Sequence, residues 1–179
     1  MYGLISIFDE FTEQLIKNIW KELKENSISS YAYEVEDRIP HITFASYNNL
    51  DITDFIEQMD VIYSNRSVID IQFSTIGSFL NSCTLFFSPT VTKELFELHS
   101  NHHMIFERFN DNPNSLYLPG NWIPHCTIAN RLSQEKLIEA FNYCSKRQST
   151  IIGQIVKMAL IDVSDKNKAP IIYSKELIK

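Results

Sequence analysis

The sequence predicts an α+β protein of two similar halves related by a pseudo-two-fold axis, with antiparallel sheets lining a central cleft and helices outside. A hexapeptide occurs twice, as Pro-His-Ile-Thr-Phe-Ala at 40–45 and as Pro-His-Cys-Thr-Ile-Ala at 124–129. The segments around each copy also follow the same order of helical and extended patterns. We therefore expect one bilobal domain, 1–179, whose repeats cover approximately 9–88 and 91–175 and are intertwined across the cleft.

The first half is expected to run helix, motif strand, helix, strand, strand. Apolar residues at helical spacing predict the helices, and alternating residues rich in Ile and Phe predict the strands. Besides the motif strand, the expected elements are an extra strand at 3–8, helices at 10–25 and 51–63, and strands at 68–76 and 83–88. Gly77, Asn81 and Ser82 are expected to form the turn between the last two strands.

The second half repeats this order around the second hexapeptide. Apart from the motif strand, the expected elements are helices at 91–109 and 133–144 and strands at 151–163 and 170–173. Ser133 is a good N-cap for the second of these helices. Residues 165–168 are expected to form the last hairpin turn.

Composition excludes several classes of function. The net charge is −6 and Lys and Arg form no cluster, which argues against sequence-independent binding of duplex DNA. No segment is long and apolar enough for a membrane span, and the first residues lack the pattern of a signal peptide. Three cysteines without close spacing favour a reducing, cytoplasmic location. A partner that is only locally anionic, such as a nucleotide end, stays compatible with this charge, and a monomer is favoured.

The repeated His-x-Thr sequence predicts a site because residues i and i+2 of a strand share one face. His41 therefore lies beside Thr43, and His125 beside Thr127, while the apolar residues between them face the core. Cys126 is among these apolar residues, so we do not expect it to act as a nucleophile. Packing alone gives no reason for His and Thr on the face away from the core.

Two facing imidazoles can share acid and base catalysis. One takes a proton from the attacking oxygen and the other gives a proton to the leaving oxygen. The threonine hydroxyls then hold the non-bridging oxygens of a phosphate. This arrangement predicts in-line attack on a phosphodiester, such as a 2′,3′-cyclic phosphate, with no metal or cofactor. The expected catalytic residues are His41 and His125, and the expected phosphate-binding residues are Thr43 and Thr127.

These motifs resemble those of the 2H phosphoesterase superfamily, and in particular the bacterial 2′-5′ RNA ligase-like proteins. Residues 40–47 and 118–129 carry the resemblance, and the order of elements agrees with it over nearly the whole chain. It implies 2′,3′-cyclic phosphodiesterase activity or reversible 2′-5′ ligation of RNA ends, with the histidines as acid and base. Many ligase-like members have an Arg five residues after the second His. Here Asn130 takes that position and Arg131 follows, which puts an RNA-phosphate role for Arg131 in doubt.

Four further residues are weaker candidates for binding substrate. Tyr47 and Trp122 flank the motifs and are candidates for stacking on a base. Arg38 precedes the first motif and is a candidate for contacting a phosphate, as is Arg131 after the second. Each has a simpler interpretation as packing or as a solvated charge.

Two other functions are compatible with the sequence. The same cleft would serve a non-catalytic module that binds a nucleotide or RNA end. His99, His102 and His103 have the i, i+3, i+4 spacing of a metal site on a helix. More often, such histidines belong to an amphipathic helix without a metal.

Overall fold

The computed structural model describes residues 1–147 and 149–179. Its helices are α1 (Glu10–Glu25), α2 (Ile52–Tyr63), α3 (Lys93–Ile105) and α4 (Gln134–Ser145), with short 3-10 turns at Tyr31–Tyr33 and Glu107–Phe109. Its strands are β1 (Tyr2–Phe8), β2 (His41–Tyr47), β3 (Ile69–Phe79), β4 (Thr84–Pro89), β5 (Cys126–Ala129), β6 (Ile151–Asp162) and β7 (Ile171–Glu176). Along these two stretches, none of the helices combines the length and apolar character needed to cross a bilayer.

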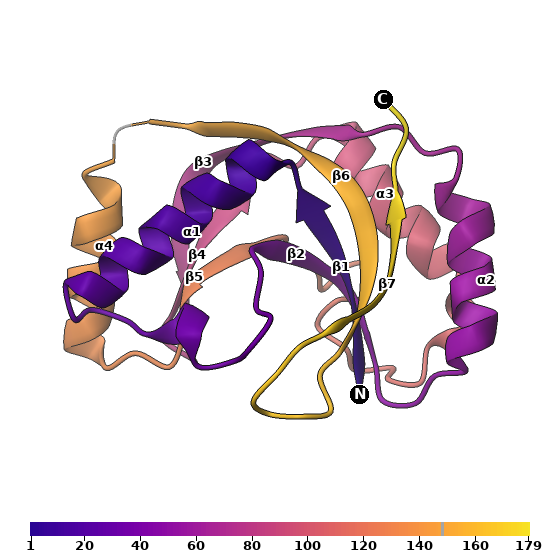
Figure 1. Cartoon of the computed structure of the whole chain (residues 1–179), viewed down its shortest axis with the longest axis horizontal. Helices are drawn as coiled ribbons and strands as arrows, with labels where there is room; N and C mark the ends of the chain where they lie inside the picture. The colour runs from indigo at the N-terminus through magenta and orange to yellow at the C-terminus, as the bar shows by residue number, and fades with distance from the viewer. Residues whose placement is uncertain (148) are drawn as a thin grey trace.

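All the strands belong to one antiparallel sheet, in the order β2-β1-β6-β3-β4-β5, with β7 also paired to β6. The predicted α+β class is thereby confirmed. The strands that carry the two motifs, β2 and β5, are the two ends of this order. They are nevertheless in contact with one another, so the sheet bends until its first and last strands meet (Figure 1).

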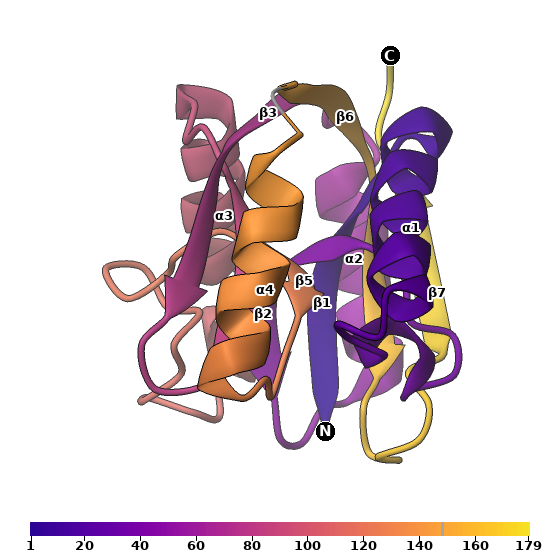
Figure 2. The same cartoon turned by 90° about the vertical axis from the view of Figure 1, so that its left-hand side faces the viewer.

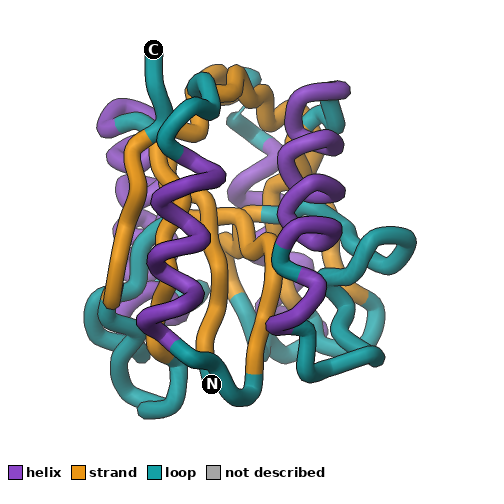
Figure 3. Tube along the Cα trace, turned by 90° about the vertical axis from the view of Figure 1, so that its right-hand side faces the viewer, coloured by secondary structure: helices purple, strands orange, loops and turns teal. Residues whose placement is uncertain are grey.

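The strands of the two sequence repeats are interleaved within the sheet. Strand β6 pairs with β1 through residues 155–162 and with β3 through residues 151–155. Helices α1 and α4 lie at one end of the molecule and α2 and α3 at the other (Figures 1, 2 and 3). Each end therefore has one helix from each repeat, which brings distant segments together at the centre.

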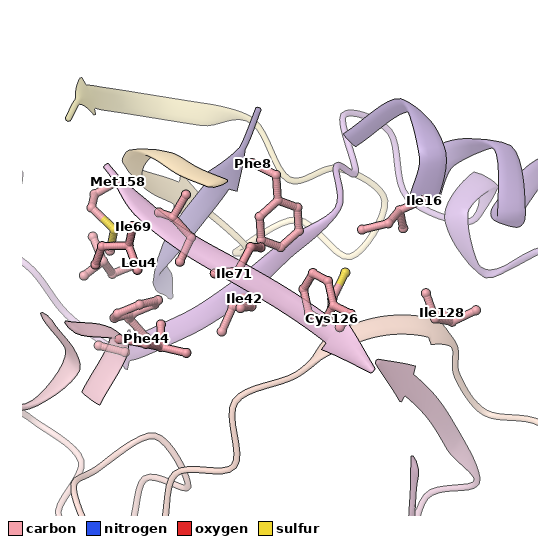
Figure 4. Packing of buried hydrophobic residues seen from close by; sticks show 14 of the residues in the cluster. Leu4, Phe8, Ile16, Ile42, Phe44, Ile69, Ile71, Cys126, Ile128 and Met158 are labelled. Atoms are coloured by element: carbon pink, nitrogen blue, oxygen red, sulfur yellow. The ribbon is translucent and has the colours of Figure 1, made fainter. Parts of the chain in front are cut away.

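Both motif strands bury their apolar residues in the same core. Ile42 and Phe44 from β2 and Cys126 and Ile128 from β5 are at most 1% exposed, and they lie together in one cluster (Figure 4). Burying side chains of this size stabilises the fold by about 1.5–3 kcal/mol each. The core thus fixes which face of each motif strand points away from it.

Each helix begins at a polar side chain that accepts a hydrogen bond from a backbone N–H two or three residues into it. These caps are Asp9, Asp51, Thr92 and Ser133. Such a bond satisfies one of the free N–H groups at a helix start. The predicted cap at Ser133 is confirmed, and its side chain accepts from Lys136 at 3.2 Å.

Several boundaries differ by a few residues from the sequence prediction, and two of the differences have a clear physical reason. The helix predicted at 91–109 is shorter, because Thr92 caps its start and a 3-10 turn follows Phe106. The prediction that Gly77 forms a turn is wrong, because it lies inside β3. A Cβ at this position would come within 2.9 Å of the Phe86 ring on β4, so the glycine gives space for a large aromatic side chain.

Candidate active site

The two motif strands present the same pattern of exposure. His41 and Thr43 are half-buried, whereas Ile42 between them is fully buried. His125 and Thr127 are likewise half-buried on either side of the buried Cys126. The thiol of Cys126 has its pKa raised to about 12 by burial, which leaves it protonated and unsuited to nucleophilic attack at neutral pH.

A β-bulge interrupts both strands at equivalent positions. In β2, Thr43 pairs with Ile5 and Ala45 with Leu4, which leaves Phe44 as an extra residue. In β5, Ile128 is extra in the same way, between Thr127 and Ala129. A bulge reverses the alternation of faces beyond it.

The first bulge explains why Tyr47, a candidate for stacking on a base, does not lie at the site. Beyond it, Ser46 is half-buried and Tyr47 is only 3% exposed. The Tyr47 hydroxyl lies 2.7 Å from Nε2 of His102 in the core. The expectation that Tyr47 stacks on a base is therefore wrong.

The second bulge places Asn130 on the same face as Thr127. Its Oδ1 accepts a hydrogen bond from the Thr84 hydroxyl at 2.6 Å and another from the backbone N–H of Arg131 at 2.8 Å. Arg131 itself is exposed and has a left-handed backbone with φ 56°. No contact of its side chain with the motif residues is found in the described part of the chain.

Both catalytic candidates are oriented by the chain that precedes them. Nδ1 of His41 lies 2.7 Å from the carbonyl oxygen of Ile39, and Nδ1 of His125 lies 2.8 Å from that of Ile123. Since a carbonyl can only accept, Nδ1 carries the proton and donates in each case. In the neutral ring, Nε2 is then the nitrogen that carries no proton.

The surroundings of both rings disfavour their charged forms. Burial, with smaller effects of His125 and Arg38, lowers the pKa of His41 to about 4, although the bond to Ile39 opposes this. Burial also lowers the pKa of His125. His125 is among the groups that lower the pKa of His41, and the strands that carry these residues, β2 and β5, are in contact.

Apolar residues surround each histidine. Ile5 and Ile7 pair with Thr43 and His41 across the sheet and form a small buried cluster with Ala159 and Ile161. On the opposite side, the ring of Phe79 lies edge-on to His125 at 4.8 Å between centroids, and Phe86 lies at 5.3 Å. This setting is the physical cause of the lowered histidine pKa values.

Tryptophans from the opposite repeats contact the two threonine carbonyls. Trp122 Nε1 donates to the carbonyl oxygen of Thr43 at 2.9 Å, and Trp20 Nε1 donates to that of Thr127 at 3.2 Å. The Trp122 ring stacks on His99 at 3.8 Å between centroids and also packs on Phe44. One face of the Trp122 ring is therefore taken by His99, and stacking of Trp122 on a base stays a prediction.

Two tyrosines accompany the threonine side chains. The phenol of Tyr31 lies against Thr127 and that of Tyr117 against Thr43, and each threonine partly offsets the rise that burial causes in the tyrosine pKa. Sequence reasoning missed both tyrosines and Trp20. A signal was present, because Tyr31 and Tyr117 precede His41 and His125 by similar distances along the chain.

Arg38 is the cationic side chain that the structure brings to this site. Its guanidinium lies over the Tyr31 ring at 3.9 Å and donates to the Tyr31 carbonyl oxygen. It also lines a pocket of about 400 Å³ together with Lys17, Trp20 and Tyr33. Arg38 also contributes to the lowered pKa of His41, and its contact with a phosphate stays a prediction.

The histidines of α3 each bind an oxygen. Nε2 of His99 lies 2.7 Å from the Tyr117 carbonyl oxygen, and Nε2 of His103 lies 3.0 Å from that of Phe44. His102 lies between the hydroxyls of Tyr47 and Tyr63 at 2.7 and 2.8 Å. Along 1–147 and 149–179, no group of three His, Cys, Asp or Glu side chains is arranged to hold a metal ion.

Residues 11–167 match the profile of the 2′-5′ RNA ligase superfamily. Among solved structures, E. coli LigT in its apo form has a TM-score of 0.65 at 10% identity, over 99% of this chain and 97% of that chain. LigT complexed with 3′-AMP has a TM-score of 0.64 at 10% identity (99% and 98%), and the protein TT0787 of Thermus thermophilus has 0.62 at 11% (98% and 97%). None of the curated proteins matches the chain.

Proposed function

The chain belongs to the 2′-5′ RNA ligase superfamily, a group of 2H phosphoesterases, and from this premise we propose that it cleaves or forms nucleotide phosphodiesters without a metal. The substrate would be a 2′,3′-cyclic phosphate or a 2′-5′ linkage at an RNA end. The observation that carries the proposal is that both histidines are anchored through Nδ1 and keep Nε2 for proton exchange.

In hydrolysis of a 2′,3′-cyclic phosphate, water attacks phosphorus and one bond from phosphorus to a ribose oxygen breaks. Nε2 of one histidine takes the proton of the water, and Nε2 of the other gives a proton to the ribose oxygen that leaves. Ligation would follow the same steps with the 5′-hydroxyl of a second ribose in place of water. Cleavage of the resulting 2′-5′ linkage would reverse them, re-form the cyclic phosphate and make the two histidines exchange roles. Thr43 and Thr127 would donate to the non-bridging oxygens, which gather charge during displacement.

This centre is bordered by apolar and cationic groups that suit a nucleotide. LigT has been solved with 3′-AMP and with ATP, which supports a nucleotide as the ligand here. Phe79 is half-buried beside His125, and Leu80 at the hairpin tip is 97% exposed. We infer that Phe79, in place of Tyr47, offers the face for the base, and that Arg38 contacts a phosphate.

Turnover by purified protein in the presence of a chelator tests the proposal. The substrates are the four 2′,3′-cyclic nucleotides, which should give nucleoside monophosphates, and a 2′-5′-linked dinucleotide, which should give a 2′,3′-cyclic nucleotide and a nucleoside. We expect His41→Ala and His125→Ala each to lose at least about 10²-fold in kcat, the contribution of one proton transfer. His103→Gln is the matched control, because glutamine keeps a donor for the Phe44 carbonyl outside the proposed proton path.

Two results would contradict this function. Turnover by both alanine variants at the wild-type rate would exclude the histidines. Binding of 3′-AMP by a wild-type protein that turns over none of the substrates would instead identify a nucleotide-binding module.

A further inference from the structure

The carbonyl oxygens of the two motif threonines are both bound from the opposite sequence repeat. Strands β2 and β5 end the sheet order, so each has a partner strand on one side only. Carbonyl groups along the other side need a hydrogen-bond donor from elsewhere. Trp122, which precedes the second motif, supplies one to Thr43, and Trp20, from the first repeat, supplies one to Thr127.

These two residues are the chain's only tryptophans. Each indole is itself held in place by packing against the site. Trp122 is stacked nearly parallel on His99, at 2° between planes, and His99 in turn contacts the Tyr117 carbonyl oxygen. Trp20 is 5% exposed and packs edge-on against Tyr31 at 5.9 Å.

The crossing of these bonds matters because the two motif strands contact each other without a ladder of backbone hydrogen bonds. In the sheet order, four strands separate them. Small changes of bend along those strands would add up to a change in the distance between the motifs. A bond from each repeat to the other's motif opposes such a change directly.

We propose that Trp20 and Trp122 are positioning residues, whose crossed indole–carbonyl bonds set the separation and orientation of the two His-x-Thr pairs around the phosphate. This inference rests on the proposed function for its kinetic consequence. Its structural consequence can be measured without any substrate. Neither indole is assigned a contact with the reacting atoms.

The test uses Trp20→Phe and Trp122→Phe, which keep an aromatic ring but remove the N–H donor. Tyr63→Phe is the matched control, since it also removes one polar group of a buried aromatic side chain, the hydroxyl beside His102. For each variant, backbone amide shifts, affinity for inorganic phosphate, kcat, KM and the unfolding temperature are measured. Because Trp122 is more exposed than Trp20, Trp122→Phe decides the matter should Trp20→Phe fail to fold.

We expect the amide signals of 42–44 to move in Trp122→Phe and those of 126–128 in Trp20→Phe, in the opposite repeat each time. For a cyclic nucleotide, kcat should fall about tenfold to a hundredfold, as for a misplacement near 1 Å, and this fall should exceed the rise in KM. Tyr63→Phe should lower the unfolding temperature at unchanged kcat. The affinity for inorganic phosphate should also fall in both tryptophan variants and not in the control.

Folded tryptophan variants with wild-type kcat, phosphate affinity and amide signals would overturn the proposal. So would a loss of kcat in Tyr63→Phe as large as theirs, which would indicate a general effect of stability. If the wild type itself turns over no substrate, the proposed function fails. The phosphate affinities and the amide shifts in the opposite repeat then decide this inference alone.

Discussion

His41 donates its Nδ1–H to the carbonyl oxygen of Ile39 at 2.7 Å. His125 repeats this contact with Ile123 at 2.8 Å. In both cases a proline separates the two residues, and a residue before proline is held extended. The sequence Ile-Pro-His therefore sets the tautomer of each imidazole locally, whereas the facing of the two rings depends on the bend of the whole sheet.

The activity should have an acidic pH optimum. The base must be unprotonated, which requires a pH above its pKa, and the acid must be protonated, which requires a pH below its pKa. The pKa of His41 is lowered to about 4, and that of His125 is lowered from 6.5. Measured as kcat/KM against pH, the profile should be bell-shaped with its maximum between about 4 and 6.5.

This bell has the same shape whichever histidine is the base, so it tests the pair and not the assignment. A rate that rises steadily to pH 9 would contradict two histidines with lowered pKa values.

Removing a threonine hydroxyl should slow catalysis while leaving the fold intact. Thr43→Val and Thr127→Val keep the branched shape but lose the donor to the phosphate. By analogy with removal of one oxyanion donor, we expect kcat to fall about 10²-fold. Thr43→Ser and Thr127→Ser, which keep the hydroxyl, should retain most of the activity, and steady-state kinetics distinguishes the two pairs.

Phe79→Ala should weaken the binding of substrates with a base more than that of small diesters. Stacking of a base on an aromatic ring contributes about 1–3 kcal/mol, so KM for a purine 2′,3′-cyclic nucleotide should rise about tenfold. A cyclic phosphodiester of glycerol has no base and is the control substrate. An equal rise in KM for both substrates would show that Phe79 acts by shaping the surroundings of His125.

Acid should destabilise the fold before the carboxylates titrate. All five histidines have a pKa lowered by burial, to about 4 for His41 and His99. Between about 4 and 6.5 the unfolded chain then binds more protons than the folded one. The free energy of unfolding therefore rises with pH in this range and falls as pH is lowered.

The unfolding temperature measured at pH 7 and at pH 5 checks this expectation. His102→Gln removes a fully buried histidine between Tyr47 and Tyr63, and it should reduce the difference between the two pH values. Equal unfolding temperatures at pH 7 and pH 5 in the wild type would contradict it.

Local patterns in the sequence predicted most of the elements. The helix at 10–25 has the predicted bounds, because its apolar spacing and the cap at Asp9 act within a few turns. His41 and Ile42 lie on opposite faces of their strand because side chains alternate along a strand, which is a property of neighbouring residues. The β-bulges could not be predicted in this way, since a bulge is defined by pairing with another strand.

Tyr47 illustrates what only the tertiary structure decided. Alternation from Thr43 would have placed it on the cleft face, but the extra residue Phe44 turns it into the core beside His102. Trp20 was missed for a similar reason, because its indole binds a carbonyl 107 residues away. The sequence determined which chemical groups the protein carries and which residues share a strand face. The bend of the sheet and the contacts between the repeats decided which of those groups meet, because such contacts depend on packing between segments that are distant along the chain.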